Sequence, residues 1–151
     1  METAFMKIRI NSRSLKVASF TKNYLERKLK YPFEYGVSSR NLIMLDFDCP
    51  EKPRRCIEEA RATGRALVEE YGGDVCVYVT PNGYHLIYFR FLKWSTVKKI
   101  LRRLRLAVDE GVLMYLDKNH LEACLRRGYM TLRLGRQRKI WCYSYGVERR
   151  Y

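Results

Sequence analysis

The chain has 151 residues, of which 47% are hydrophobic, and it carries 30 Lys and Arg against 16 Asp and Glu, a formal net charge of +14. This length and apolar content predict one folded domain with its own core and exclude a disordered chain. No apolar run approaches the ~20 residues that a membrane-spanning helix needs, so a transmembrane protein is also excluded.

The excess of positive charge favours a polyanionic partner, because Lys and Arg bind phosphates and release counterions. Together with an aromatic content of 13%, it favours nucleic acid or nucleotides over a merely solvated basic surface. The first residues, Met1 to Lys7, lack the basic and then long apolar stretch of a signal peptide. We therefore expect an intracellular, cytoplasmic protein.

Cysteines are spread along the chain without forming any Cys-x-x-Cys pair: Cys49, Cys56, Cys76, Cys124 and Cys142. Since the histidines do not complete a zinc-binding pattern either, structural zinc is not expected. Buried thiols are the default expectation, with an intracellular disulfide as the alternative that a hyperthermophile would allow.

Residues 1–39 are expected to form an amino-terminal helical segment. Apolar groups recur at roughly helical spacing from Leu15 to Leu29, until Tyr31-Pro32-Phe33 interrupts the pattern. A core over residues 40–146 then begins with a buried strand, Asn41 to Phe47. The next element is a helix, Glu51 to Tyr71, with Pro53 in its first turn and Gly72-Gly73 at its end.

The remaining elements follow in short blocks. We expect two strands joined by a Pro81-Asn82-Gly83 turn, a basic helix, another strand and a short helix: Val75 to Thr80, Tyr84 to Phe91, Ser95 to about Val108 with Ser95 as its cap, Val112 to Leu116, and Lys118 to Arg127 ending at Gly128. A final hairpin is expected from Tyr129 to Leu134 and Ile140 to Tyr145. The central order is strand, helix, strand, strand, helix, strand. It predicts an α+β fold of one domain, with a ferredoxin-like or RNA-recognition-like split unit between the helical segment and the hairpin.

Acidic side chains end the first strand of this unit. Asp46 and Asp48 are two residues apart and would share one face of the strand. Two unpaired carboxylates on one face repel each other unless a cation lies between them, and hard oxygen ligands favour Mg²⁺ or Mn²⁺. The alternative is that Asp48-Cys49-Pro50 merely turns the chain and caps the next helix.

A histidine begins the third strand. In a split unit this strand lies antiparallel beside the first, so His85 is expected next to the end of the Asp46 strand. A histidine there could bind a triphosphate oxygen, and Gly83 would let a substrate approach the backbone closely. A purely structural histidine is the alternative.

Topology alone does not decide which acid joins Asp46 and Asp48 in the candidate site. Asp117 ends the apolar run Val112 to Leu116, but an ideal split unit would place it at the far end of the sheet and bring Asp109 nearer to Asp46. A bent or differently ordered sheet would favour Asp117 instead. The last part of the chain is rich in cationic side chains, including Arg133, Arg136 and Lys139. Such side chains are suited to binding phosphate.

These blocks resemble the signatures of the archaeo-eukaryotic primase superfamily, which includes primase small subunits, plasmid primase-polymerases and the polymerase domains of bacterial end-joining ligases. The matching segments cover about residues 40 to 140: Leu45-Asp46-Phe47-Asp48, Gly83-Tyr84-His85-Leu86, Tyr115-Leu116-Asp117 and Thr131-Leu132-Arg133-Leu134. The chain is short for this family, as a virus- or plasmid-encoded minimal core would be. In this family, the motif that corresponds to Gly83-Tyr84-His85-Leu86 often has a serine at the position of Gly83, so this chain lacks one phosphate-binding hydroxyl.

The resemblance implies a DNA primase or primase-polymerase, a nucleotidyltransferase that uses two metal ions to make primers in DNA replication. Asp46, Asp48 and Asp117 would be catalytic and would bind Mg²⁺ or Mn²⁺, which favours Asp117 over Asp109. The nucleotide-binding set would be Gly83, His85, Arg133, and more loosely Arg136 and Lys139. The implied partners are a single-stranded DNA template and nucleoside triphosphates, with a larger primase subunit or a helicase as a further partner, and no membrane.

Other functions fit the same sequence. A non-catalytic DNA- or RNA-binding replication accessory on the same fold would bind with strong salt dependence and need no metal. A metal-dependent nuclease could use the same acids, although the chain has no paired histidines of the His-x-His kind.

Overall fold

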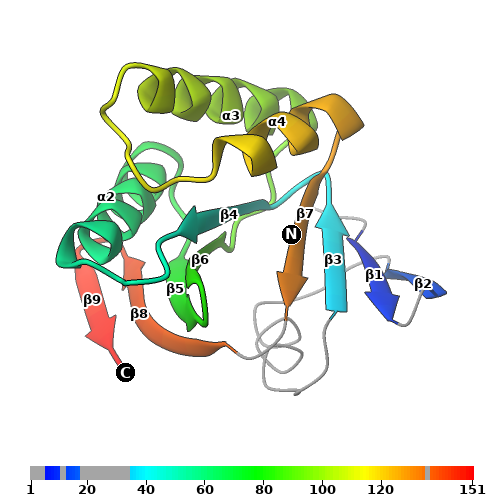
Figure 1. Ribbon diagram of the computed structural model, residues 1–151. Coiled ribbons are helices and arrows are strands. Elements are labelled where there is room, and N and C mark those ends of the chain that lie inside the picture. Colours follow the sequence, from blue (N-terminus) through cyan, green and yellow to red (C-terminus); the bar gives the residue numbers. More distant parts are fainter. Residues whose placement is uncertain (1–5, 11–12, 18–34, 135–136) are drawn as a thin grey trace.

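The computed structural model describes residues 6–10, 13–17, 35–134 and 137–151. Two antiparallel sheets and three helices form an α+β fold in this part of the chain (Figure 1). The amino-terminal sheet has the strand order β2-β1-β3-β7: β1 (Met6–Ile10), β2 (Arg13–Val17), β3 (Tyr35–Ser39) and β7 (Met130–Leu134). The central sheet has the order β4-β6-β5-β8-β9: β4 (Ile43–Asp48), β5 (Val75–Thr80), β6 (Gly83–Tyr88), β8 (Arg138–Ser144) and β9 (Val147–Arg150).

The helices are α2 (Arg54–Tyr71), α3 (Trp94–Asp109) and α4 (Lys118–Arg127). In Figure 1, α3 and α4 lie side by side above β4, and α2 packs against β5, β6 and β8. None of these described helices is long and apolar enough to cross a membrane.

Burial explains the central strands. β4 and β6 read as nearly continuous apolar runs because both of their faces are covered. Every residue of β6 is buried, and Ile43, Met44 and Leu45 of β4 have no exposed surface. The turn Pro81-Asn82 joins β5 to β6 as expected, with Thr80 opposite Gly83. The expected boundaries of α4 are confirmed at both ends, Lys118 and Arg127.

The amino-terminal expectation is corrected where the structure describes it. Arg13–Val17 is a strand paired with β1, so the expected helix does not begin at Leu15. The rest of that expected helix, residues 18–29, lies outside the described residues. The short polar and apolar alternation in β2 fits a pleated surface as well as a helix start.

The cap of α3 is also corrected. The helix begins at Trp94 and its cap residue is Lys93, whose side chain makes no capping hydrogen bond. Instead, the backbone carbonyl oxygen of Lys93 accepts hydrogen bonds from the backbone amides of Thr96 and Val97. Ser95 therefore lies inside the first turn.

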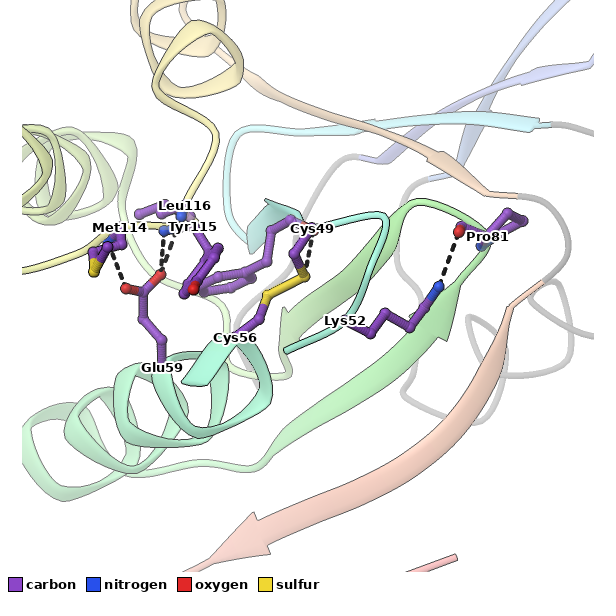
Figure 2. Close-up of a disulfide and its surroundings, with 9 residues drawn as sticks. Cys49, Lys52, Cys56, Glu59, Pro81, Met114, Tyr115 and Leu116 are labelled. Atoms are coloured by element: carbon purple, nitrogen blue, oxygen red, sulfur yellow. Dashed lines mark hydrogen bonds between the residues drawn. A yellow bond between two sulfur atoms is a disulfide. The ribbon is translucent and has the colours of Figure 1, made fainter. Parts of the chain in front are cut away.

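The strand expected over Val112 to Leu116 does not form. Only Leu116 bridges Phe47, in antiparallel fashion. Competition for the backbone amides explains the difference. The Glu59 carboxylate on α2 accepts from the amides of Met114, Tyr115 and Leu116, which are therefore not free for a β-ladder (Figure 2).

The final hairpin pairs other strands than expected. β7 joins β3 in the amino-terminal sheet, whereas β8 pairs with β5 and β9 in the central sheet. The hairpin at the end of the chain is therefore β8–β9, turning at Tyr145-Gly146. Glu148 anchors it, because its carboxylate accepts from Trp141 Nε1 and from Arg65, each at 2.6 Å.

Four of the five cysteines are paired, which corrects the expectation of buried thiols. Cys49 is bonded to Cys56, and Cys76 is bonded to Cys142. Only Cys124 is a free, buried thiol. The two cysteines of each disulfide are separated by a turn or by a long stretch of sequence. The pairs therefore do not form a Cys-x-x-Cys motif that could be recognised in the sequence.

Candidate functional site

The acids and the histidine meet at the end of β4. In the β4–β6 ladder, Asp46 lies opposite His85 and Asp48 lies opposite Gly83. The Nε2 atom of His85 is 3.6 Å from Oδ1 of Asp46. This is the adjacency that the antiparallel pairing of the two strands predicts. His85 is buried, whereas the Asp46 side chain keeps 35% of its surface exposed.

Gly83 has a packing reason to be glycine. Its φ is +154°, and a Cβ there would lie 1.9 Å from the carbonyl oxygen of Phe47. A serine at this position would collide with β4 backbone. The close approach of β6 to β4 therefore requires a glycine at this position.

Asp117 lies directly beside Asp46. Its backbone N–H donates to the carbonyl oxygen of Asp46 at 2.9 Å, and the N–H of Asp48 donates to the carbonyl oxygen of Tyr115 at 2.9 Å. Because Leu116 alone bridges to β4, the chain reaches Asp117 at the same sheet end as Asp48, and not at the far end. The rival acid, Asp109, accepts from Lys118 Nζ at 2.5 Å at the end of α3.

Asp117 also begins α4. Its Oδ1 accepts from the backbone N–H of His120 at 3.1 Å, which is the usual role of an aspartate cap. One oxygen of the third acid is therefore engaged with the helix.

The carboxylates act on one another. Burial raises the pKa of Asp46 from 3.8 to about 6, and the negative charges of Asp117 and Asp48 add to this effect, while His120 opposes it. Asp46 is therefore an acid whose ionised form is disfavoured by its surroundings and would be favoured by a nearby cation.

His85 is a neutral ring near pH 7. Burial lowers its pKa to about 4, although its hydrogen bond with Gln137 acts in the other direction. Nδ1 lies 2.6 Å from Oε1 of the Gln137 side chain, and this contact holds the ring so that Nε2 faces the Asp46 carboxylate. The His85 and Asp46 pair is consequently not an ion pair at this pH.

A second histidine, His120, lies in the first turn of α4, where its backbone N–H donates to the Asp117 cap. His120 Nε2–H donates to the carbonyl oxygen of Thr131 and lies 3.7 Å from the Cys124 sulfur. Burial opposes its charge, but Cys124, the Thr131 carbonyl and the Asp46 carboxylate together raise the pKa of His120 above its ordinary value. The only sequence signal for it is its position three residues after the Asp117 cap.

The expected phosphate-binding residues are only partly described. Arg133 is in β7, opposite Gly36 in the amino-terminal sheet, and Arg136 lies outside the described residues. Lys139 is in β8, which β6 and β5 separate from β4, and its ammonium lies 4.5 Å from the centre of the Tyr151 ring. The structure therefore brings together Asp46, Asp48, Asp117, Gly83 and His85, while Lys139 belongs to another part of the sheet.

The carboxylates of this site are oxygen ligands of the kind that a hard cation prefers. A cation would also relieve the burial and repulsion that raise the pKa of Asp46. In arrangement the set of ligands is incomplete: the described residues contain no group of three or more His, Cys, Asp or Glu side chains already disposed around a common point. A metal held here would be bound by Asp46, Asp48 and Asp117.

Comparison with known proteins adds no family. No protein-family model matches the chain, and no curated protein matches its sequence.

Proposed function

We propose that the protein is a template-dependent nucleotidyltransferase of the primase-polymerase type. The observation that carries this proposal is the meeting of Asp117 and His85 with Asp46 at one sheet end. Three segments far apart in the sequence, each marked by the resemblance, supply these residues. That meeting is what a site for a metal-bound triphosphate requires.

The strand arrangement supports a split βαββαβ unit as the core of the proposal. β4 has β6 on one side and the Leu116 bridge on the other, and β5 lies beyond β6. The helices α2 and α3 follow the first and third strands. The fourth strand of the unit would then be reduced to one bridging residue.

Each residue has a role in this proposal. Asp46, Asp48 and Asp117 would hold Mg²⁺ or Mn²⁺, which would stabilise the attacking and leaving oxygens of an in-line phosphoryl displacement. His85 would donate to a triphosphate oxygen from Nε2, in the tautomer that carries its proton on that nitrogen, and Gln137 orients the ring. Arg133, Arg136 and Lys139 are the candidates for further phosphate contacts, on a single-stranded template. A larger primase subunit or a helicase would complete the machinery.

The test is synthesis on a single-stranded DNA template with labelled nucleotides, with Mg²⁺ or Mn²⁺, and with and without a primer. We expect metal-dependent product that is lost in Asp46→Ala/Asp48→Ala and in Asp117→Asn. Asp109→Asn serves as the matched control and should keep synthesis, because Asp109 pairs with Lys118 and makes no described contact with β4. Product that persists without Asp46 and Asp48 in a folded protein would refute the assignment.

A non-catalytic nucleic-acid-binding accessory is the second candidate. It is favoured by the use of Asp117 as a helix cap and by the absence of a ready metal-binding group among the described residues. It predicts salt-sensitive DNA binding without synthesis, with or without metal. Metal-dependent cleavage of the template in the same assay would instead indicate a nuclease.

A further inference from the structure

We propose that Glu59 is a positioning residue that fixes Asp117 beside Asp46; the purpose of that positioning rests on the function proposed above. Glu59 lies on α2, and its carboxylate accepts three backbone amides of the segment before Asp117 (Figure 2). Oε1 accepts from Met114 at 2.5 Å, and Oε2 accepts from Tyr115 at 2.8 Å and Leu116 at 3.1 Å.

These bonds complete the hydrogen bonding of the segment. The amides of Val112 and Leu113 donate to the Ala107 carbonyl at the end of α3, and the amide of Asp117 donates to Asp46. Between them, Met114, Tyr115 and Leu116 have no backbone acceptor among the described residues and donate to Glu59. The carboxylate therefore takes the place of the β-ladder that the sequence pattern suggests, because a charged acceptor can serve several amides at once.

Glu59 is itself held relative to the other acids. The Cys49–Cys56 disulfide joins the residue after Asp48 to α2, three positions before Glu59 (Figure 2). Near the same helix end, Lys52 Nζ donates to the Pro81 carbonyl of the turn that precedes His85. The start of α2 and the turn before it thus contact each of the chain segments that bring the candidate site together.

Removing the charge should loosen the segment while leaving the rest of the fold. In Glu59→Gln the single amide oxygen accepts poorly in place of two carboxylate oxygens, and the side-chain NH₂ would face backbone donors. The amides of residues 114–116 are then left without full partners. Asp117 would lose its fixed register beside Asp46.

The experiment measures Mn²⁺ binding by the full chain, together with amide hydrogen exchange at residues 114–116. Glu58→Gln is the matched control: it makes the same change one position away, on an exposed side chain that forms an ion pair with Arg54. We expect the Mn²⁺ dissociation constant of Glu59→Gln to rise about tenfold or more, the scale found for partners that orient metal ligands. Its amides at 114–116 should exchange faster, whereas Glu58→Gln should match wild type in both measurements.

The outcomes separate the two proposals. Equal Mn²⁺ affinity in Glu59→Gln and Glu58→Gln overturns the positioning role, even if the amides exchange faster. The variant Asp46→Asn tests whether Mn²⁺ binds at the proposed site. The proposed function is refuted if wild type does not bind Mn²⁺, or if Asp46→Asn binds it as tightly as wild type does. If the proposed function is refuted in this way, unchanged amide exchange in Glu59→Gln would also refute the claim that Glu59 holds the backbone of residues 114–116. If Glu59→Gln does not melt cooperatively, Glu59→Asp, with a shorter carboxylate, replaces it under the same criteria.

Discussion

At the scale of single residues, the molecule places an acid where its charge is unfavourable. Asp46 is mostly covered and is repelled by the charges of Asp117 and Asp48, so its carboxyl holds a proton at a pH where ordinary aspartates have lost theirs. Strained electrostatics of this kind are common at functional sites, because a ligand that relieves them binds more tightly. The cost falls on the stability of the protein without ligand.

Asp46→Asn should therefore stabilise the metal-free protein at neutral pH. The folded pKa of about 6 exceeds the ordinary 3.8, so the folded state binds more protons between these values and wild type loses stability as pH rises through them. Above pH 6 the variant should be more stable by about 1 to 2 kcal/mol, a value reduced for the partial exposure of the side chain.

Thermal unfolding from pH 3.5 to pH 8 checks this expectation. The melting temperatures of wild type and Asp46→Asn should converge at the acid end and separate toward neutral pH. A wild type that is the more stable of the two above pH 6 would contradict the electrostatic account. Glu58→Gln, an exposed change, serves as the control.

At the scale of elements, cross-links tie segments that the sequence separates. Cys76–Cys142 joins β5 to β8 across 66 residues, whereas Cys49–Cys56 closes a separation of 7. The cysteines of both pairs are buried. The loss of packing on substitution is thus similar for the two pairs, and the difference between them lies in the length of chain that each one constrains.

The longer link should contribute more to stability. Loop-closure entropy gives about 4 kcal/mol for Cys76–Cys142 and about 2.5 kcal/mol for Cys49–Cys56. Denaturant unfolding of Cys76→Ala/Cys142→Ala and Cys49→Ala/Cys56→Ala, compared with wild type, measures both. Equal losses, or a greater loss from the shorter link, would run against the entropic explanation. Wild type in reductant should lose both contributions.

Elements with strong local signals could be predicted from the sequence, and pairings that depend on distant partners could not. The proline-asparagine turn and the glycine after α4 fix β5, β6 and α4 closely. Val112 to Leu116 fails as a strand because Glu59, distant in sequence, takes its amides. Nothing distinguishes Glu59 from the exposed Glu58 in a helical pattern. β7 likewise carries a normal strand pattern that does not say which sheet it joins.

The same division applies to the site. Asp46, Asp48 and His85 could be placed together from strand order alone, because antiparallel neighbours fix their register. The choice of Asp117 over Asp109 could not, since it depends on a ladder cut to one bridge. Gln137 and His120 contact the site through a loop and a buried helix face, for which the sequence holds no periodic signal.

At the scale of the whole molecule, the dominant property is the net charge of +14. Exposed arginines occur at the end of α4, Arg126 and Arg127, and on β9, Arg149 and Arg150. Such a surface binds polyanions mainly by releasing their counterions. Affinity for single-stranded DNA should therefore depend on salt whether or not the protein is an enzyme.

Binding of a labelled oligonucleotide, measured from 50 to 300 mM salt, tests this. The logarithm of the association constant should fall linearly with the logarithm of salt concentration, with a slope of about −3.5 if about five phosphates are contacted. Arg149→Gln/Arg150→Gln should flatten the slope if β9 contributes. An affinity that does not change with salt would rule out a phosphate-based interface.

The last strand of the central sheet has a consequence for how copies of the protein behave together. Within the described part of the chain β9 is paired on one side only, and all four of its residues are exposed. An unpaired strand edge is a template on which another chain can add, and proteins commonly protect such edges with charge. Glu148 is tied down by Arg65 and Trp141, which leaves consecutive arginines along this margin. Concentrated solutions should therefore resist edge-to-edge aggregation through mutual repulsion, and should lose that protection when the arginines are neutralised.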